Sequence, residues 1–257
     1  MTATSAAATL LALGGVPLVQ AGDDLATIMI AACEANGETL RDGDILVLAQ
    51  KIVSKAEGRA VALATVTPSP EAIDLGAQCH KDPRLTQLIL SEAETVMRVR
   101  PGVIIVRHRL GLVLANAGID QSNIEQDGDG IALLLPVDPD GSAAALRQSI
   151  RDRTGVDVAV VIIDSLGRAW RKGTCGIAIG VAGMGGLLDL RGVSDLHGRQ
   201  LQTSELGLAD EVAAAASLIM GQAGEGRPVV LMRGIDRGPT DGRATDLIRE
   251  PALDLFP

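Results

Sequence analysis

The stretch "VAVVIIDSLGRAWRKG", Val158–Gly173, joins an apolar run directly to a polar and basic segment. The run from Val158 to Ile163 is rich in valine and isoleucine, which is typical of a β-strand buried in a sheet. Asp164 and Ser165 follow this run at once. Because the ends of buried strands line crevices in α/β proteins, Asp164 is a candidate metal ligand and Ser165 a candidate second ligand. The alternative interpretation is a plain strand-end cap.

Positive charge follows the same strand, although the chain as a whole carries a net charge of −9. The cations are Arg168, Arg171 and Lys172. Arginine and lysine side chains bind anionic groups such as phosphate and carboxylate. A solvated basic turn is the alternative, and the concentration of these cations in an acidic chain counts against it.

Similar short apolar runs recur on both sides of this stretch and predict further strands. They begin at Ile45, Val103, Leu112, Ile131, Ile177 and Val229, and a first strand is expected at Leu10–Leu13. Helices are predicted at 22–37, from Pro70, from Pro83, at 142–155 and at 204–221. Because helices and strands do not alternate regularly, the sequence favours a mixed α+β (mixed α/β) fold over a doubly wound sheet. A domain at 1–234 is expected, followed by an extended or loosely packed tail at 235–257.

The amino-acid composition favours a globular protein and argues against several other classes of protein. Hydrophobic residues make up 47% of the 257 residues, which is enough for a substantial core. Aromatic residues are only 1% and the net charge is negative, which argues against nucleic-acid binding. No apolar run approaches the roughly 18 residues of a membrane helix. Three widely spaced cysteines without a CxxC pair fit a reducing cytoplasm, and the three histidines are interpreted as surface or capping residues.

Three other polar segments are candidate sites. "GLVLANAGIDQSN", 111–123, carries Asp120, whose carboxylate could bind a divalent cation, although a turn with an Asx motif is the simpler interpretation. "TSELGLADE", 203–211, places Glu205 at the start of a predicted helix, where a first-turn acid is again the simpler interpretation. "AQKIVSKAEGR", 49–59, resembles a phosphate-approach loop without a Walker pattern, and an amphipathic strand explains it equally well.

Taken together, these segments resemble the coenzyme F420-0:γ-glutamyl ligase family from about Gly15 to Gly234. Their order and number carry the resemblance, with "GVPLVQAGDDLA", "GDILVLAQKIVSKAEGR", "HKDPRLTQLILSE", "LLLPVDPDGSAAALR" and "LRGVSDLHGRQLQTSELGLADEVAAAASLIMG" added to the stretches above. The resemblance implies an unusual mixed fold that forms a tight homodimer. It also implies a ligase of coenzyme F420 biosynthesis, in which GTP activates the carboxylate of the deazaflavin precursor F420-0 and L-glutamate attacks. An acyl phosphate would provide the activation, and further glutamates would be γ-linked.

The same resemblance assigns roles residue by residue. The metal ligands fall on Asp120, Asp164, Glu205 and Ser165, and would hold two divalent cations, Mg²⁺ or Mn²⁺, with K⁺ as a further candidate. Lys55 joins the three carboxylates as a catalytic residue because it can offset phosphate charge. The guanine-nucleotide contacts fall on Val16, Pro17, Leu18 and Val19, on Gln50, Lys55 and Asn123, and on Thr203, Ser204, Leu206, Gly207, Leu208, Ala209 and Asp210.

The sequence departs from the family pattern at "WRKGTCG", where Gly176 stands in place of a common acidic residue and Cys175 is unusual. If the acidic residue that other members commonly have at this position holds substrate or metal, the substrate specificity or the rate of this protein would differ from theirs. A metal-dependent nucleotide hydrolase or phosphotransferase on the same scaffold is the alternative function. Phosphate release that does not depend on glutamate would favour it.

Overall fold

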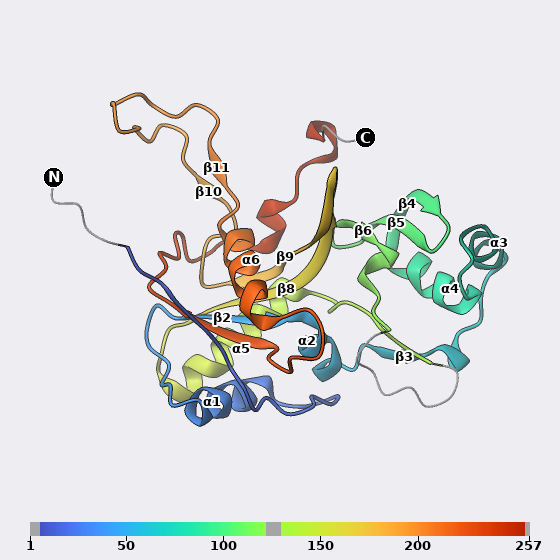
Figure 1. Cartoon of the computed structure of the whole chain (residues 1–257), viewed down its shortest axis with the longest axis horizontal. Helices are drawn as coiled ribbons and strands as arrows, with labels where there is room; N and C mark the ends of the chain where they lie inside the picture. The colour runs from blue at the N-terminus through green and yellow to red at the C-terminus, as the bar shows by residue number, and fades with distance from the viewer. Residues whose placement is uncertain (1–5, 122–129, 255–257) are drawn as a thin grey trace.

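The computed structural model describes residues 6–121 and 130–254. Figure 1 shows a larger lobe built on a central sheet and a smaller lobe beside it. The central sheet has the strand order β1 (Thr9–Ala12), β12 (Val229–Arg233), β2 (Ile45–Ala49), β8 (Ala159–Arg168) and β9 (Arg171–Ala182). β2 and β8 pair in parallel, and the other neighbours pair antiparallel. The mixed α+β fold predicted from the sequence is confirmed.

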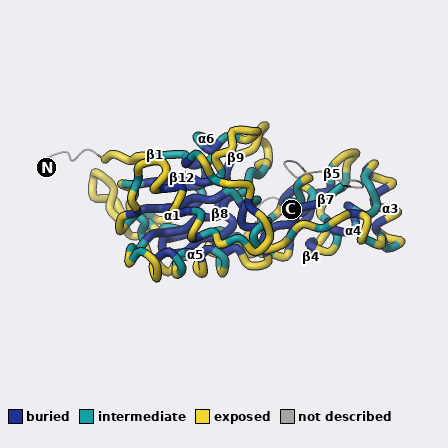
Figure 2. The backbone as a smooth tube through the Cα atoms, turned by 90° about the horizontal axis from the view of Figure 1, so that it is seen from below, coloured by how far each residue is buried: buried dark blue, intermediate teal, exposed yellow. Residues whose placement is uncertain are grey.

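The two faces of the central sheet are covered by different helices because alternate residues of each strand point to opposite sides. Leu46 and Leu48 share one apolar cluster with residues of α1 (Leu25–Ala35) and α5 (Pro139–Thr154). Ile45 and Val47 share the other cluster with residues of α6 (Leu208–Met220). Figure 2 shows this buried core running along the central strands.

Close approach of α6 to the sheet explains Gly176, the departure noted in the sequence. A Cβ at Gly176 would lie 2.6 Å from the carbonyl oxygen of Ala213 and 2.7 Å from Cβ of Ser217, both in α6. Such distances are sterically forbidden, so an acidic side chain could not occupy this position without a shift of α6. The structure therefore explains the missing acid by helix packing on β9.

The smaller lobe is formed by the chain between β2 and α5. It contains α2 (Gln50–Ala56), β3 (Ala60–Ala62), α3 (Pro70–Cys79), α4 (Pro83–Glu92), β4 (Ala93–Arg100), β5 (Val103–His108), β6 (Val113–Ala115) and β7 (Ile131–Leu133), with short 3₁₀ turns at Leu63–Thr65 and Asn116–Gly118. β4, β5 and β6 form one sheet and β3 pairs with β7. Ser69 and Asp82 cap α3 and α4 as their first-turn prolines predict, and both helices pack on a third apolar cluster.

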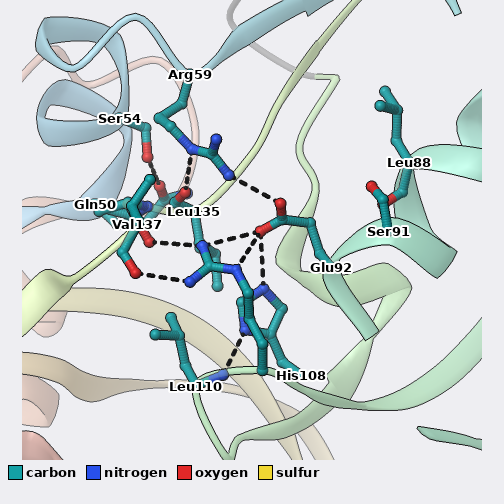
Figure 3. A network of polar contacts seen from close by, with 12 residues as sticks. Gln50, Ser54, Arg59, Leu88, Ser91, Glu92, His108, Leu110, Leu135 and Val137 are labelled. Atoms are coloured by element: carbon teal, nitrogen blue, oxygen red, sulfur yellow. Dashed lines mark hydrogen bonds and ion pairs between the residues drawn. The ribbon is translucent and has the colours of Figure 1, made fainter. Parts of the chain in front are cut away.

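An ionic network centred on the buried Glu92 joins elements of the smaller lobe to the segment between β7 and α5 (Figure 3). Glu92, at the end of α4, accepts hydrogen bonds from Arg59 Nη2 at 3.0 Å and from Arg109 Nε at 3.1 Å. His108 Nε2 lies 3.4 Å from Glu92 Oε2, at the outer limit of a hydrogen bond. Arg59 and Arg109 also donate to backbone carbonyls at 135–137. His108 is fully buried, so its interpretation as a surface residue is wrong. Its Nδ1 accepts a hydrogen bond from the backbone N–H of Leu110 at 3.0 Å, which agrees with the alternative of a capping residue.

Two hairpins extend from the larger lobe. β8 and β9 continue past the sheet as a long hairpin. The second hairpin is an arm, residues 190–204, that projects from the lobe (Figure 1). At its base, β10 (Leu188–Asp189) pairs with β11 (Glu205–Leu206). The described part of the chain after Gly234, residues 235–254, packs on the second cluster through Ile235, Ala244 and Leu247. It contains 3₁₀ turns at Ala244–Leu247 and Pro251–Leu253.

Several predicted element boundaries differ from the structure. Segment 50–56 is helical, not an amphipathic strand. α5 begins at Pro139 because Asp138 caps it, and α6 begins at Leu208 because Glu205–Leu206 pair with β10. β8 does not end at Ile163 but continues to Arg168. Within the described residues, every helix is too short or too polar to span a bilayer.

Candidate functional site

A cavity of about 420 Å³ lies where β2 ends beside the middle of β8. These strands are parallel neighbours with Ala49 opposite Ile163, so the residues that follow this pair, Gln50 and Asp164, reach the same edge of the sheet. Three further segments complete the wall: the loop 16–19, Asp120 beside β7, and the connection from α6 to β12. Described residues that line the cavity and carry side-chain charge are Lys51, Lys55, Asp120, Asp164, Glu225 and Arg227.

Asp120 and Asp164 come from distant parts of the chain and face this one cavity. Asp120 is held by a β-bridge to Leu133, with backbone hydrogen bonds of 3.0 and 2.8 Å, and its carboxylate forms an ion pair with Lys51. Burial raises the pKa of Asp164, and the negative charge of Asp120 raises it further. The backbone N–H of Ser165, which donates to Asp164 Oδ1 at 2.8 Å, and the charge of Lys51 oppose that rise. The cavity therefore holds two carboxylates whose mutual repulsion is only partly offset.

The hydroxyl of Ser165 and the side chain of Gln222 meet beside these carboxylates. Ser165 Oγ donates to Gln222 Oε1 at 2.5 Å, which joins β8 to the connection after α6. That connection, "GQAGEGRP" at 221–228, has three glycines, and all eight of its residues line the cavity. At Gly221 φ is 84°, and a Cβ would overlap the side chain of Glu225. Sequence reasoning missed this loop, although three glycines between a helix and a strand were a signal of close backbone approach to a ligand.

Six of the predicted nucleotide contacts line the cavity: Val16, Pro17, Leu18, Val19, Gln50 and Lys55. Gln50 is buried at the start of α2 and accepts a 2.8 Å hydrogen bond from Ser54. Asn123 lies outside the described residues.

The predicted contacts at 203–210 lie elsewhere. They occupy the loop and strand before α6 and its first turn, whereas the cavity includes the last turn of that helix. Leu208 and Ala209 are buried in the second cluster, and Asp210 Oδ1 accepts from the backbone N–H of Ala178 at 2.9 Å. Burial raises the pKa of Asp210 against that hydrogen bond.

Glu205, the third predicted metal carboxylate, is not brought to the cavity within one chain. It precedes α6, while Ser217 and Met220 at the other end of this 13-residue helix line the cavity. At 1.5 Å per residue the helix separates the two ends by roughly 20 Å. Glu205 instead lies 3.4 Å from Arg191 at the base of the projecting arm.

The donor atoms gathered in the cavity suit a hard divalent cation. Two carboxylates, the hydroxyl of Ser165 and the amide oxygen of Gln222 are all oxygen donors, the kind that Mg²⁺ and Mn²⁺ prefer. Among the described residues, no three His, Cys, Asp or Glu side chains form a metal-binding group. A cation here would therefore take part of its coordination from a bound substrate or from water.

The chain matches the family model described as F420-0:Gamma-glutamyl ligase over residues 15–234. The chain belongs to this family. It is 47% identical to the coenzyme F420:L-glutamate ligase of Methanothermobacter thermautotrophicus, over 96% of this chain and 98% of that protein. It is 45% identical to the protein of the same name from Methanopyrus kandleri, over 94% and 95%. The protein of that name from Methanocaldococcus jannaschii is also 45% identical, over 84% and 86%.

Proposed function

We propose that this chain is a GTP-dependent ligase that joins L-glutamate to the deazaflavin precursor F420-0 and then adds further γ-linked glutamates. One observation carries the proposal: in a member of this family, Asp120, Asp164 and a glycine-rich loop line the same cavity. The names of the relatives support the substrate and the ligase reaction. The loop and the cavity cations support the use of a nucleoside triphosphate.

The nucleotide is proposed to lie between the loop 16–19, the start of α2 and the glycine-rich connection. Val16 and Leu18 offer an apolar surface for the base, and Gly224 and Gly226 leave backbone N–H groups accessible to phosphate oxygens. Lys55 and Arg227 supply positive charge at the same cavity. These groups fix the terminal phosphate in position for attack by the precursor carboxylate.

Asp120, Asp164, Ser165 and Gln222 are the residues that would hold divalent cations, Mg²⁺ or Mn²⁺. Such cations, when bound, neutralise charge on the transferred phosphoryl group and on the leaving diphosphate. A monovalent cation such as K⁺ is proposed as an additional activator, with the cavity carbonyls as its ligands. Lys51, paired with Asp120, orients that carboxylate toward the cavity.

The proposed reaction has two steps. A carboxylate oxygen of the precursor attacks the γ-phosphorus of GTP, the bond to the β-phosphate oxygen breaks, and GDP leaves an acyl phosphate. The α-amine of L-glutamate then attacks the acyl carbon, loses a proton, and expels inorganic phosphate as the amide forms. The activation is needed because direct condensation of a carboxylate with an amine is unfavourable in water.

Incubation of the protein with F420-0, L-glutamate, GTP and Mg²⁺ or Mn²⁺ tests this function. We expect products whose masses rise by successive glutamate residues, with one phosphate released for each glutamate added. Replacement of GTP by ATP should reduce the rate. Phosphate release that is the same without glutamate and precursor would contradict ligation and indicate a hydrolase.

We further propose that the protein works as a homodimer. Leu196, at the tip of the projecting arm, is fully exposed, and Val193 is half-exposed. Apolar side chains on an extension with little support from its own chain are suited to burial against a second copy. Analytical ultracentrifugation should give a dimer, and Leu196→Ser should shift it toward monomer. A monomeric wild-type protein at micromolar concentration would contradict the proposal.

A further inference from the structure

The β8–β9 hairpin connects the cavity physically to a solvent-exposed tip. Asp164 and Ser165 line the cavity, and β8 continues from them to Arg168, which pairs with Arg171 across a two-residue turn. At about 3.3 Å per residue, Arg168 lies roughly 13 Å along the strand from Asp164. A single hairpin therefore spans the distance from the proposed reaction centre to the tip.

The tip carries an aromatic side chain in a chain that almost lacks them. Trp170 is the only tryptophan, the chain has no tyrosine, and the single phenylalanine, Phe256, lies outside the described residues. The side chain of Trp170 is 88% exposed. A tryptophan side chain usually stabilises a protein through the large apolar surface that it buries. Because Trp170 buries little of that surface, packing within this chain does not explain why a tryptophan stands here.

The backbone at Trp170 strengthens this conclusion. Its φ is 63°, in the left-handed region that a bulky residue adopts at a cost and glycine adopts freely. The turn would therefore form more easily with glycine at this position. Strained non-glycine residues of this kind cluster at ligand-binding sites.

Positive charge surrounds the exposed indole. Arg168, Arg171 and Lys172 are all exposed, and none of them forms an ion pair within the described parts of the chain. A flat aromatic face beside free guanidinium groups is suited to a planar ring that carries an anionic substituent. The deazaflavin of the proposed reaction is such a molecule, with a flat tricyclic ring and an acid that must reach the cavity.

We propose that the tip of the β8–β9 hairpin binds the deazaflavin ring of the acceptor substrate. Trp170 stacks on the ring, Arg168 and Arg171 offset the negative charge of the substrate, and the hairpin directs the substrate acid toward Asp164. This assignment rests on the proposed function for the identity of the substrate. It makes Trp170 a specificity-determining residue that acts on substrate affinity and not on phosphoryl transfer.

Tryptophan fluorescence gives a direct test because all tryptophan emission comes from Trp170. Titration of the protein with 5-deazariboflavin, which has the ring without the acid, should quench this emission saturably. N-acetyltryptophanamide under the same conditions corrects for absorption by the ring. Quenching by GTP with Mg²⁺ and not by 5-deazariboflavin would overturn the assignment.

Steady-state kinetics test the same residue in the complete reaction. Trp170→Ala should raise KM for F420-0 by about tenfold, in line with the loss of one aromatic stacking contact. The kcat value and KM for GTP should stay within about twofold of wild type, as expected when only binding common to ground and transition states is removed. Trp170→Phe should recover most of the affinity, and Ile73→Ala, a truncation of an exposed apolar residue on α3, is the matched control.

The outcomes separate this inference from the proposed function. If wild-type protein adds glutamate but 5-deazariboflavin does not quench and Trp170→Ala leaves KM unchanged, the inference fails alone. If no glutamate is added, the proposed function fails, while quenching still reports on ring binding. A change of oligomeric state in Trp170→Ala with unchanged KM would show that the tip is an interface between subunits and would overturn ring binding.

Discussion

Glu92 and Asp164 are both largely buried carboxylates, and the charges around them differ in a way that separates a structural role from a chemical one. Burial alone raises the pKa of Glu92, but its contacts with His108, Arg109 and Arg59 outweigh burial and lower the pKa to about 2. Burial also raises the pKa of Asp164, and there the nearest charges are those of Asp120 and Lys51, so the pKa remains raised. The charge of Glu92 is satisfied by the protein itself, whereas that of Asp164 is not.

The comparison gives a criterion for function. A buried carboxylate that already has three cationic or hydrogen-bonding partners stabilises the fold and has little capacity left for a ligand. A buried carboxylate beside a second one, in an open cavity, costs stability unless something positive binds there. On this criterion Glu92 belongs to the scaffold and Asp164 to the site.

The largest effect is expected from Asp164→Asn. This variant removes a proposed metal ligand, so turnover should fall below detection in the glutamate-addition assay. Because the substitution also removes a buried charge next to Asp120, the melting temperature should stay the same or rise. Asp152→Asn, on the exposed surface of α5, is the control and should behave as wild type. Glutamylation at the wild-type rate in Asp164→Asn would remove Asp164 from the site.

Glu92→Gln should produce the opposite pattern, with stability lost and chemistry retained. The variant should lose about 3 kcal/mol of unfolding free energy at pH 7, since about 2.5 pKa units separate the folded group from a free glutamate. KM for GTP should not change, because none of the network residues lines the cavity.

The pH dependence has a defined sign. The pKa of Glu92 is lower in the folded protein, so its contribution is complete above about pH 4.5 and is lost as pH falls toward about 2. Urea unfolding at several pH values should show this decline in the wild type and a weaker decline in Glu92→Gln. Equal acid sensitivity in both proteins would contradict the structural role of the network.

Gln222→Ala tests whether the missed glycine-rich connection belongs to the site. Loss of its contact with Ser165 should lower kcat/KM for GTP by about tenfold, within the usual range for residues that orient ligands. Gln148→Ala, on α5, removes an amide that donates a hydrogen bond to the nearby Asp152, and it is the matched control. An identical kcat/KM in Gln222→Ala and Gln148→Ala would place the nucleotide elsewhere.

The sequence predicted the sheet better than it predicted the site. Runs such as those at Ile45 and Val229 are buried on both faces, so their composition alone identifies them as strands. The meeting of Asp120 with Asp164 depends on the parallel pairing of β2 and β8 and on the bridge from Asp120 to Leu133, which no local pattern reveals. The Glu92 network likewise joins residues up to 76 positions apart, and the burial of Glu92 could not be predicted from isolated charges in the sequence.

The smallest effect is expected from Glu205→Gln. This variant tests whether the comparison of Glu92 with Asp164 extends to an exposed carboxylate. Glu205 differs from both Glu92 and Asp164 because it is exposed and, among the described residues, its ion pair is with Arg191 alone. Exposed ion pairs of this sort contribute little to stability. With Glu205 beyond the far end of α6 from the cavity, activity should change by less than about twofold. A loss as deep as that of Asp164→Asn would mean that the arm delivers Glu205 to the cavity of a second subunit. Mixing Asp164→Asn with Glu205→Gln would then restore activity, because a dimer with one chain of each kind would hold one intact site. In that case the proposed set of ligands from a single chain would be wrong.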